Sequence, residues 1–185
     1  MTDFDNKAFE QRIEQFVRRH ELLAGAREVL VGFSGGPDST ACLLIACQWN
    51  VPCRAVHLHH GLRGADADRD AEWCRCFCEA RGIPHETHRL DVAARRLAGE
   101  SVEEAARRCR LEFWQWRADP AIRVALGHHA DDALETLLLR LGRGANASGL
   151  TGLRPRTVVA GTTLIRPLLD LRRSDVEAYL EKKGI

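Results

Sequence analysis

The sequence predicts an α/β protein built on a doubly wound, mainly parallel five-stranded sheet with helices on both faces. Short apolar runs alternate with helical segments along the chain, an order that is typical of parallel sheets covered by crossover helices. Three polar motifs directly follow predicted strands. Because ligands of such sheets bind at the carboxyl ends of the strands, we expect these motifs to converge on one crevice.

The first predicted elements are a helix and a buried strand. Apolar side chains recur at helical spacing over residues 7–24, and Gly25 is expected to be the C-cap. Residues 1–26 would then form an N-terminal helix packed on the core. The apolar run 28–33 ends in a glycine-rich turn, which is typical of a buried strand in a parallel sheet.

The remaining elements continue the same alternation. Pro52 and Pro120 break the chain before predicted strands, and Ser101 with Glu104 forms the capping-box pattern of a helix start. Further strands are predicted at 53–60, 85–92 and 122–128, a hairpin at 157–168, and helices at 39–48, 66–81, 102–118, 132–141 and 172–183.

The composition is that of a globular protein, with 45% hydrophobic and 29% charged residues in a chain of 185. This length suits one α/β domain, predicted to span residues 27–185. No apolar run approaches the roughly 20 residues of a membrane-spanning helix. The N-terminal segment also lacks the apolar centre of a signal peptide. We therefore expect a cytoplasmic protein with no membrane partner.

Neither the cysteines nor the net charge identifies a partner. Seven cysteines, an odd number without a secretion signal, argue against a disulfide framework. Cys74 and Cys78 should share one helix face while Cys76 points elsewhere, which is a poor arrangement for a metal cluster. The net charge of +1 predicts no nucleic-acid partner. Arginines, which suit phosphate or simply form a solvated face, do cluster at 107, 108 and 110, at 140 and 143, and at 154 and 156.

The first motif, SGGPDS, has the features of a phosphate-binding loop. Its glycines let the backbone turn tightly and approach a ligand, and the following helix offers unpaired N–H groups and the positive end of its dipole. Asp38 can cap the helix or reach Mg²⁺. No lysine follows the glycines, so this is not a Walker A loop, and a plain strand–turn–helix connection is an equal alternative. The loop consists of Ser34, Gly35, Gly36, Pro37, Asp38 and Ser39.

The second motif, GHHADDALET, places acids at the start of a helix. Asp131, Asp132 and Glu135 share a face at spacings of three and four residues. They could bind Mg²⁺ or act as a general base, but a capping box over 132–135 explains them equally well. His128 and the histidine after it could contact phosphate or assist proton transfer.

The third motif, HLHHGLR, ends the second predicted strand. Alternation places His57 and His59 on one face and His60 on the other, so at least one of them should be structural. Arg63 lies in the loop that follows and is a candidate phosphate or substrate clamp. Arg107, on the predicted helix 102–118, could reach a nucleotide or RNA phosphate or form salt bridges along its own helix.

Together these motifs resemble a known family. SGGPDS after an apolar strand is similar to the signature loop of the N-type ATP pyrophosphatases, which cut ATP between the α- and β-phosphates and transfer AMP to an oxygen. Within that group the chain resembles the tRNA(Ile)-lysidine synthetases from about residue 27 to its end, which implies a Rossmann-like sheet of adenine nucleotide α-hydrolase type. The matching segments are VGFSGGPDS, HLHHGLRGADADRDAEWC, EEAARRCRLEF, ALGHHADDALETLLLRLGRGANASGLTGLRP and LIRPLLDLRRSDVEAYLEKKGI.

The resemblance implies a two-step ligation that uses ATP and Mg²⁺. ATP adenylates the C2 carbonyl oxygen of the wobble cytidine in a tRNA(Ile) with a CAU anticodon, and pyrophosphate leaves. The ε-amine of free L-lysine then displaces AMP, so one hard step becomes two easier ones. Family members continue into C-terminal domains that help to hold the tRNA and are expected to be absent here. We therefore expect this chain to bind ATP but to modify tRNA poorly by itself.

The resemblance also implies roles for particular residues. The loop 34–39, His57 and Arg63 would bind ATP, and Asp38 would hold Mg²⁺ or orient the α-phosphate. Asp131 or Asp132 would hold the lysine amine or accept its proton. The implied catalytic residues are Asp38, Arg107, His128, Asp131, Asp132 and Glu135.

Three other functions compete with this interpretation. A tRNA 2-thiocytidine synthetase shares the loop, but it would need cysteines suited to an iron–sulfur cluster, and the chain has no C-x-x-C pair. A non-catalytic ATP-binding module would bind ATP without releasing pyrophosphate, and it would not need acids beside the nucleotide. A purely structural partner-binding domain would leave the three motifs at strand ends unexplained.

Overall fold

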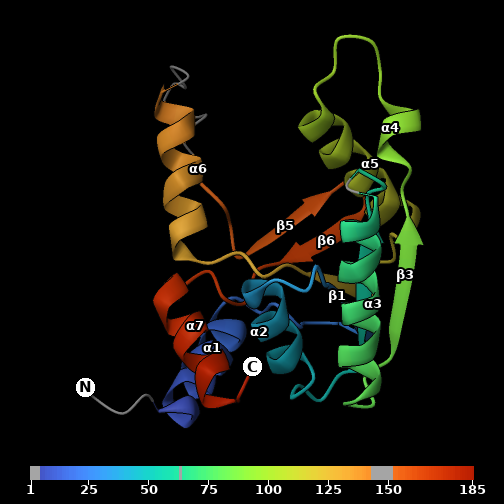
Figure 1. Ribbon diagram of the computed structural model, residues 1–185. Helices are drawn as coiled ribbons and strands as arrows, with labels where there is room; N and C mark the ends of the chain where they lie inside the picture. Colours follow the sequence, from blue (N-terminus) through green and yellow to red (C-terminus); the bar gives the residue numbers. More distant parts are fainter. Residues whose placement is uncertain (1–4, 63, 143–151) are drawn as a thin grey trace.

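A six-stranded sheet forms the centre of the molecule (Figure 1), in a computed structural model that describes residues 5–62, 64–142 and 152–185. The strand order is β3-β2-β1-β4-β6-β5, and every neighbouring pair is parallel except β5 with β6. The strands are β1 (Glu28–Gly32), β2 (Cys53–His59), β3 (His85–Arg89), β4 (Ile122–Ala125), β5 (Arg156–Val159) and β6 (Thr162–Ile165).

The predicted α/β class and hairpin are confirmed, but the count of five strands was wrong by one. Both arms of the hairpin join the sheet, because β6 pairs in parallel with β4 and β5 adds an antiparallel edge strand beyond it. An open sheet gains ladder hydrogen bonds from each added strand, so a hairpin at its edge contributes two strands rather than one.

Helices cover both faces of the sheet, as a doubly wound fold requires. Val29 and Val31 of β1 pack into one buried cluster with the first, second, third and seventh helices, whereas Leu30 packs into another with the fifth. The period of two along β1 therefore separates the two layers of the core. The helices are α1 (Asn6–Arg19), α2 (Pro37–Ala46), α3 (Ala65–Glu79), α4 (Val92–Arg95), α5 (Val102–Trp116), α6 (Ala130–Gly142) and α7 (Arg173–Lys182).

The N-terminal helix packs on the core as predicted, but it ends earlier than Gly25. His20 is the C-cap of α1, and Glu21 adopts a left-handed conformation with φ of 48°. The helix therefore ends five residues before Gly25. The positive φ of Gly25, 69°, belongs to a later bend of the chain. Phe9 of α1 stacks on Tyr179 of α7 with ring centroids 4.6 Å apart.

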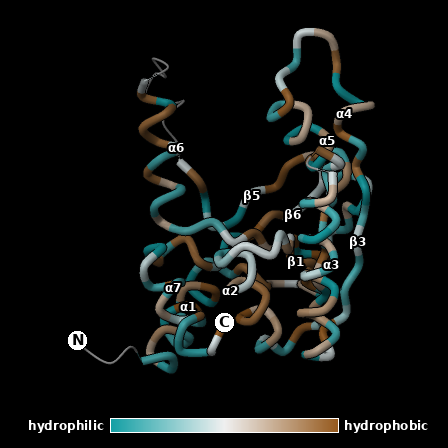
Figure 2. The backbone as a smooth tube through the Cα atoms, in the orientation of Figure 1, coloured by the Kyte–Doolittle hydropathy of each residue, from teal (hydrophilic) through white to brown (hydrophobic). Residues whose placement is uncertain are grey.

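Helix α6 differs from the other long helices because none of its residues is buried. It rises along one side of the sheet, opposite α4 and α5 (Figure 1). Apolar residues nevertheless recur along it (Figure 2). Leu134, Leu138, Leu139 and Leu141 are all exposed. In the part of the chain that the structure describes, no helix is long and apolar enough to cross a membrane.

Candidate nucleotide-binding site

The segment that follows β1, which we call the phosphate loop (residues 34–39), is braced by its own serines. The backbone N–H of Ser34 donates to Ser39 Oγ at 3.2 Å, and Ser39 Oγ donates to the Gly36 carbonyl at 2.9 Å. The two serine hydroxyls lie 3.0 Å apart. These bonds fix the loop in shape before any ligand arrives, which lowers the entropy cost of binding one.

The conformation of the phosphate loop requires glycine at one position. Gly35 has φ of +85°, and a Cβ there would lie 3.2 Å from both Cys74 Sγ and a ring carbon of Trp73. Helix α2 starts directly afterwards, with Gly36 as N-cap and Pro37 as its first residue, and no described side chain caps it. The positive end of the helix dipole is therefore available to an anion, as the sequence predicted.

The end of β4 is packed against the start of α2 without room for a side chain. A Cβ at Gly127 would lie 2.5 Å from the backbone oxygen of Asp38 and 2.9 Å from the backbone nitrogen of Ser39. This contact brings the second motif onto the phosphate loop. No role was predicted for Gly127 from the sequence, although a glycine between a strand and a polar motif is a signal of close backbone approach.

His129 connects the acids of both motifs. Its side chain is 4% exposed, and its Nε2 lies 3.6 Å from Asp38 Oδ1. On the other side of the ring, Nδ1 lies 3.5 Å from Asp132 Oδ2 and 3.6 Å from Asp131 Oδ2. The imidazole therefore lies between three carboxylates, although its Nδ1 has no hydrogen-bond partner among the described residues, and the sequence had not predicted this position.

The two aspartates of α6 also bind backbone groups. Asp132 Oδ2 accepts the N–H of His129 at 2.8 Å, so the cap covers residues 129–132 and the expected box over 132–135 was placed three residues late. Asp131 Oδ2 accepts the N–H of Arg173 at 2.8 Å, which ties the first turn of α6 to the first turn of α7. Each carboxylate is thereby oriented with one oxygen engaged.

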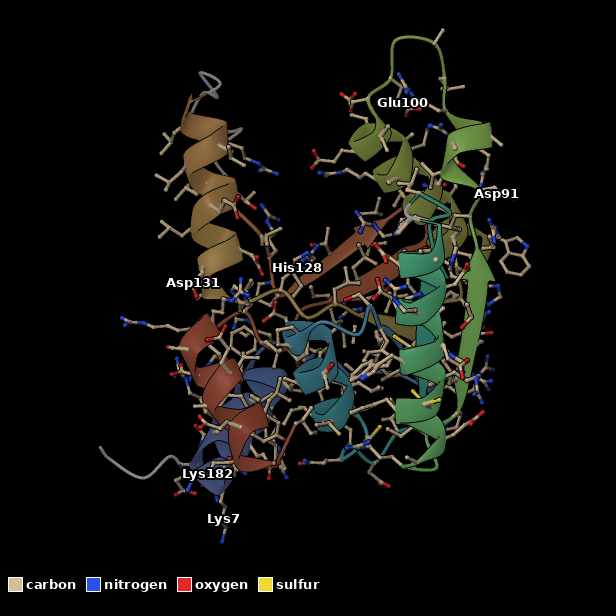
Figure 3. The ribbon with its side chains drawn as sticks, viewed as in Figure 1. Lys7, Asp91, Glu100, His128, Asp131 and Lys182 are labelled. Atoms are coloured by element: carbon tan, nitrogen blue, oxygen red, sulfur yellow. The ribbon has the colours of Figure 1, made fainter. Side chains whose placement is uncertain are left out.

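Figure 3 shows His128 at the foot of α6, on the side that faces the centre of the molecule, with Asp131 near it. Burial lowers the pKa of His128, and the positive charge of Arg166 lowers it further. Its Nδ1 is buried and has no hydrogen-bond partner among the described residues. Arg166 itself is 7% exposed and donates to the Arg154 carbonyl at 2.8 Å. His128 is therefore a neutral ring whose Nδ1 is left without a hydrogen bond beside a buried cation.

Asp38 lies where the two motifs meet, and its environment is unusual for a carboxylate. Burial raises its pKa, and electrostatic interactions with His129 and Arg173 act in the opposite direction. Its Oδ1 is buried without a hydrogen-bond partner in the described part of the chain. Arg173 is the first residue of α7. The sequence did not predict it as part of the site, because it lies far along the chain from both motifs.

The structure brings some predicted residues together and leaves others apart. His57 is 5% exposed, and its Nδ1 lies 2.9 Å from the carbonyl oxygen of Phe33, so it supports the residue that precedes the phosphate loop. Glu135 is exposed on α6, one turn beyond the paired aspartates. Arg107 is exposed on α5, across the sheet from α6 (Figure 1). Arg63 lies outside the described residues.

The site suits a magnesium ion that arrives with a nucleotide. Among residues 5–62, 64–142 and 152–185, no group of three or more His, Cys, Asp or Glu side chains is arranged to hold a metal. Mg²⁺ commonly takes only one or two protein carboxylates and completes its shell with water and phosphate oxygens. Asp38 Oδ1, which accepts no hydrogen bond from the described residues and lies beside the phosphate loop, fits that requirement.

A parallel sheet with a glycine-rich phosphate loop after its first strand, and acids after a neighbouring strand, defines a nucleotide-binding α/β protein. The chain belongs to the PP-loop domain family, which matches it over residues 5–185. Membership supports the use of ATP, as the loop chemistry predicted.

The chain is also similar to curated relatives within this family, which are named tRNA(Ile)-lysidine synthase. The chain is 39% identical over 181 residues to the tRNA(Ile)-lysidine synthase of Geobacillus kaustophilus, with 94% of this chain and 39% of that protein covered. It is 37% identical over 182 residues to the tRNA(Ile)-lysidine synthase of Bacillus licheniformis, with 94% and 38% covered. The chain therefore spans about two fifths of the length of these relatives.

Solved structures confirm the fold at much lower identity. The U34-tRNA thiolase NcsA of Methanococcus maripaludis superposes with a TM-score of 0.73 and 19% identity, covering 97% of this chain and 64% of that one. The NH3-dependent NAD synthetase of Campylobacter jejuni gives a TM-score of 0.64 and 15% identity, covering 98% and 74%. At these identities the likeness concerns the architecture.

Proposed function

We propose that this chain is the catalytic part of an enzyme that uses ATP and Mg²⁺ to join lysine to C2 of the wobble cytidine of tRNA(Ile). The observation that carries the proposal is the contact between the phosphate loop and the GHHADD segment, at Gly127 and His129. The names of the curated relatives, which match 94% of the chain, support the choice of substrate.

In the first step, the C2 oxygen of the cytidine attacks the α-phosphorus of ATP, the bond to the β-phosphate breaks, and pyrophosphate leaves. The phosphate loop and the N-terminus of α2 hold the leaving pyrophosphate. Mg²⁺ at Asp38 would supply charge neutralisation. Preorganised N–H groups and charges of this kind stabilise the transition state without reorganising during the reaction.

In the second step, the ε-amine of lysine attacks C2, the bond from C2 to oxygen breaks, and AMP leaves with that oxygen. The attacking nitrogen must lose a proton, and a carboxylate within reach can accept it. Asp131 and Asp132 each keep Oδ1 free of hydrogen bonds to described residues while Oδ2 is held by a backbone N–H. Either carboxylate is thus oriented to receive the amine.

Pyrophosphate release tests the proposal. The chain is incubated with ATP, Mg²⁺ and unmodified tRNA(Ile), with and without lysine, beside the variants Asp38→Asn and Asp66→Asn. Asp66 is a matched control because both aspartates are the second residue of a helix. We expect tRNA-dependent release that lysine increases, that Asp38→Asn loses and that Asp66→Asn keeps. Because the chain is expected to hold tRNA weakly, the assay is repeated at high tRNA concentration. Tight ATP binding with no release even there would instead indicate a non-catalytic module.

A further inference from the structure

Two cysteines far from the phosphate loop form a close thiol pair. Their sulfur atoms lie 3.8 Å apart, within hydrogen-bond contact. Cys47 is the exposed C-cap residue of α2, and Cys53 is the half-buried first residue of β2. A disulfide needs its sulfur atoms at about 2.05 Å, a separation that two adjacent side chains reach by changing rotamers when their backbones are already close.

The two thiols of this pair are not equivalent. The hydrogen bond from the Cys53 thiol lowers the pKa of Cys47, because it stabilises the Cys47 thiolate. The same bond raises the pKa of Cys53, and partial burial adds to the effect. The thiolate is the reactive form of cysteine. Cys47 is therefore the member of the pair that a dissolved oxidant can reach, and the Cys53 sulfur lies next to it.

The other cysteines lack this combination. Cys76 is equally exposed, but its sulfur lies 3.5 Å from Glu72 Oε1, and that carboxylate raises its pKa. Burial raises the pKa of Cys42 and Cys74 to about 12. Cys78 and Cys109 are also buried. The chain thus contains its own control for exposure, since Cys47 and Cys76 are both open to solvent and only the first has a thiol partner.

We propose that Cys47 and Cys53 form a reversible disulfide when the protein meets hydrogen peroxide or an organic hydroperoxide. The Cys47 thiolate attacks the peroxide oxygen, the O–O bond breaks, and Cys47 becomes a sulfenic acid while water or an alcohol leaves. The Cys53 sulfur then attacks the sulfenic sulfur, the S–O bond breaks, and a second water leaves with the Cys53 proton. Two thiols and one hydrogen peroxide give one disulfide and two waters.

The disulfide would tie the end of α2 to the start of β2 across the connecting residues 48–52. Helix α2 has ten residues and begins at the phosphate loop, so the pair lies about 15 Å along the helix from that loop. Oxidation should therefore leave the nucleotide site in place. The inference does not rest on the proposed ligase activity, and each can fail without the other.

Peptide mapping of the peroxide-treated chain tests the inference. No Lys or Arg lies between Arg27 and Arg54, so one tryptic peptide carries Cys42, Cys47 and Cys53. Chymotryptic cleavage after Trp49 separates Cys53 from Cys47, and cleavage after Leu43 or Leu44 separates Cys42 from Cys47. We expect mild peroxide treatment to join the fragments that contain Cys47 and Cys53, and dithiothreitol to part them. A disulfide to Cys42 or Cys78, or no disulfide while Cys47 stays reduced, would overturn the inference.

Trapping of the sulfenic acid supplies an independent test. In Cys53→Ser the second thiol is gone, but the serine hydroxyl can still donate a hydrogen bond to the Cys47 thiolate. Dimedone should therefore label Cys47, and it should label Cys47 about tenfold faster than Cys76. Cys76→Ser is the matched control and should still form the bond between Cys47 and Cys53. Equal labelling of Cys47 and Cys76 would show that exposure alone decides reactivity and would contradict the inference. Peptide mapping of the unaltered chain still shows whether Cys47 and Cys53 form a disulfide, even if one of the variants folds poorly.

Discussion

At the scale of single residues, the contact between Gly127 and Asp38 leaves no space for a methyl group, since a Cβ would lie 2.5 Å from a backbone oxygen. Gly127→Ala must push the end of β4 away from the start of α2. We expect the unfolding free energy in urea to fall by about 1–3 kcal/mol, as overpacking does elsewhere, and ATP binding to weaken with it.

The control for that substitution is Gly142→Ala, at the end of α6. A Cβ there would meet nothing within 4 Å. Because alanine favours a helix over glycine, its unfolding free energy should stay within about 0.5 kcal/mol of the unaltered chain or rise slightly. Equal losses in the two variants would show that the close approach at Gly127 does not matter.

We expect the ionised side chain of Asp38 to be needed for activity and to lower the stability of the fold. Burial raises its pKa, so the folded state favours the protonated form. A raised pKa contributes stability at low pH that is lost as the pH rises through the folded pKa, and at neutral pH the ionised group destabilises the fold. Asp38→Asn should therefore raise the melting temperature at neutral pH while it abolishes pyrophosphate release. A lower melting temperature in the variant would contradict this sign.

The sequence predicted which acidic side chains lie together better than it predicted the residues that connect them. Asp38, Asp131 and Asp132 were predicted and lie together around His129. His128 was chosen over His129 from the family resemblance, and the spacing of two adjacent histidines does not show which one lies between the acids. Arg173 could not be placed from spacing, since only the folded chain sets α7 beside α6. Pairing between distant segments is decided by packing, which no local pattern contains.

At the scale of elements, α2 and α6 each follow a central strand and contain adjacent leucines, yet they differ in burial. Leu43 of α2 is fully buried, whereas Leu138 of α6 is 58% exposed. Leu43→Ala should cost about 2–5 kcal/mol of unfolding free energy, because it leaves a cavity in the core. Leu138→Ala should change it by less than about 0.5 kcal/mol. Urea denaturation of both variants distinguishes them, and a large loss in Leu138→Ala would show that α6 packs on the core.

Most elements could be predicted because their signals are local. The capping box of Ser101 and Glu104 starts α5 as expected, with the two groups bonded reciprocally. The four-residue helix α4 was missed because it is too short for a helical period to show. The end of α1 was misplaced because Glu21, rather than a glycine, adopts the left-handed conformation. The end of α1 is set by tertiary contacts of the turn, in which Leu22 is fully buried.

At the scale of the whole molecule, buried histidines should make the fold sensitive to mild acid. Burial lowers the pKa of both His57 and His128. In the unfolded chain these histidines have a pKa of about 6.5, and below that pH they bind protons that the folded chain does not bind. The unfolding free energy therefore falls as the pH drops toward the lower pKa values of the folded histidines. Urea denaturation at about pH 7.5 and about pH 5.5 measures this loss.

The variant His57→Asn should reduce that pH dependence. Asparagine can still donate to the Phe33 carbonyl, which lies 2.9 Å from His57 Nδ1, but it does not titrate. The difference in unfolding free energy between the two pH values should therefore shrink. An unchanged difference would show that His57 protonation does not oppose folding.

The measurement that tests the central claim most directly follows the α-phosphate of ATP. The chain is mixed with ATP labelled at that phosphate, Mg²⁺ and unmodified tRNA(Ile), first without lysine and then with it. We predict that label enters the tRNA in the absence of lysine and leaves as AMP once lysine is added, and that Asp38→Asn shows neither event. Label that never enters the tRNA, while the chain releases pyrophosphate from ATP, would contradict adenylation of the cytidine.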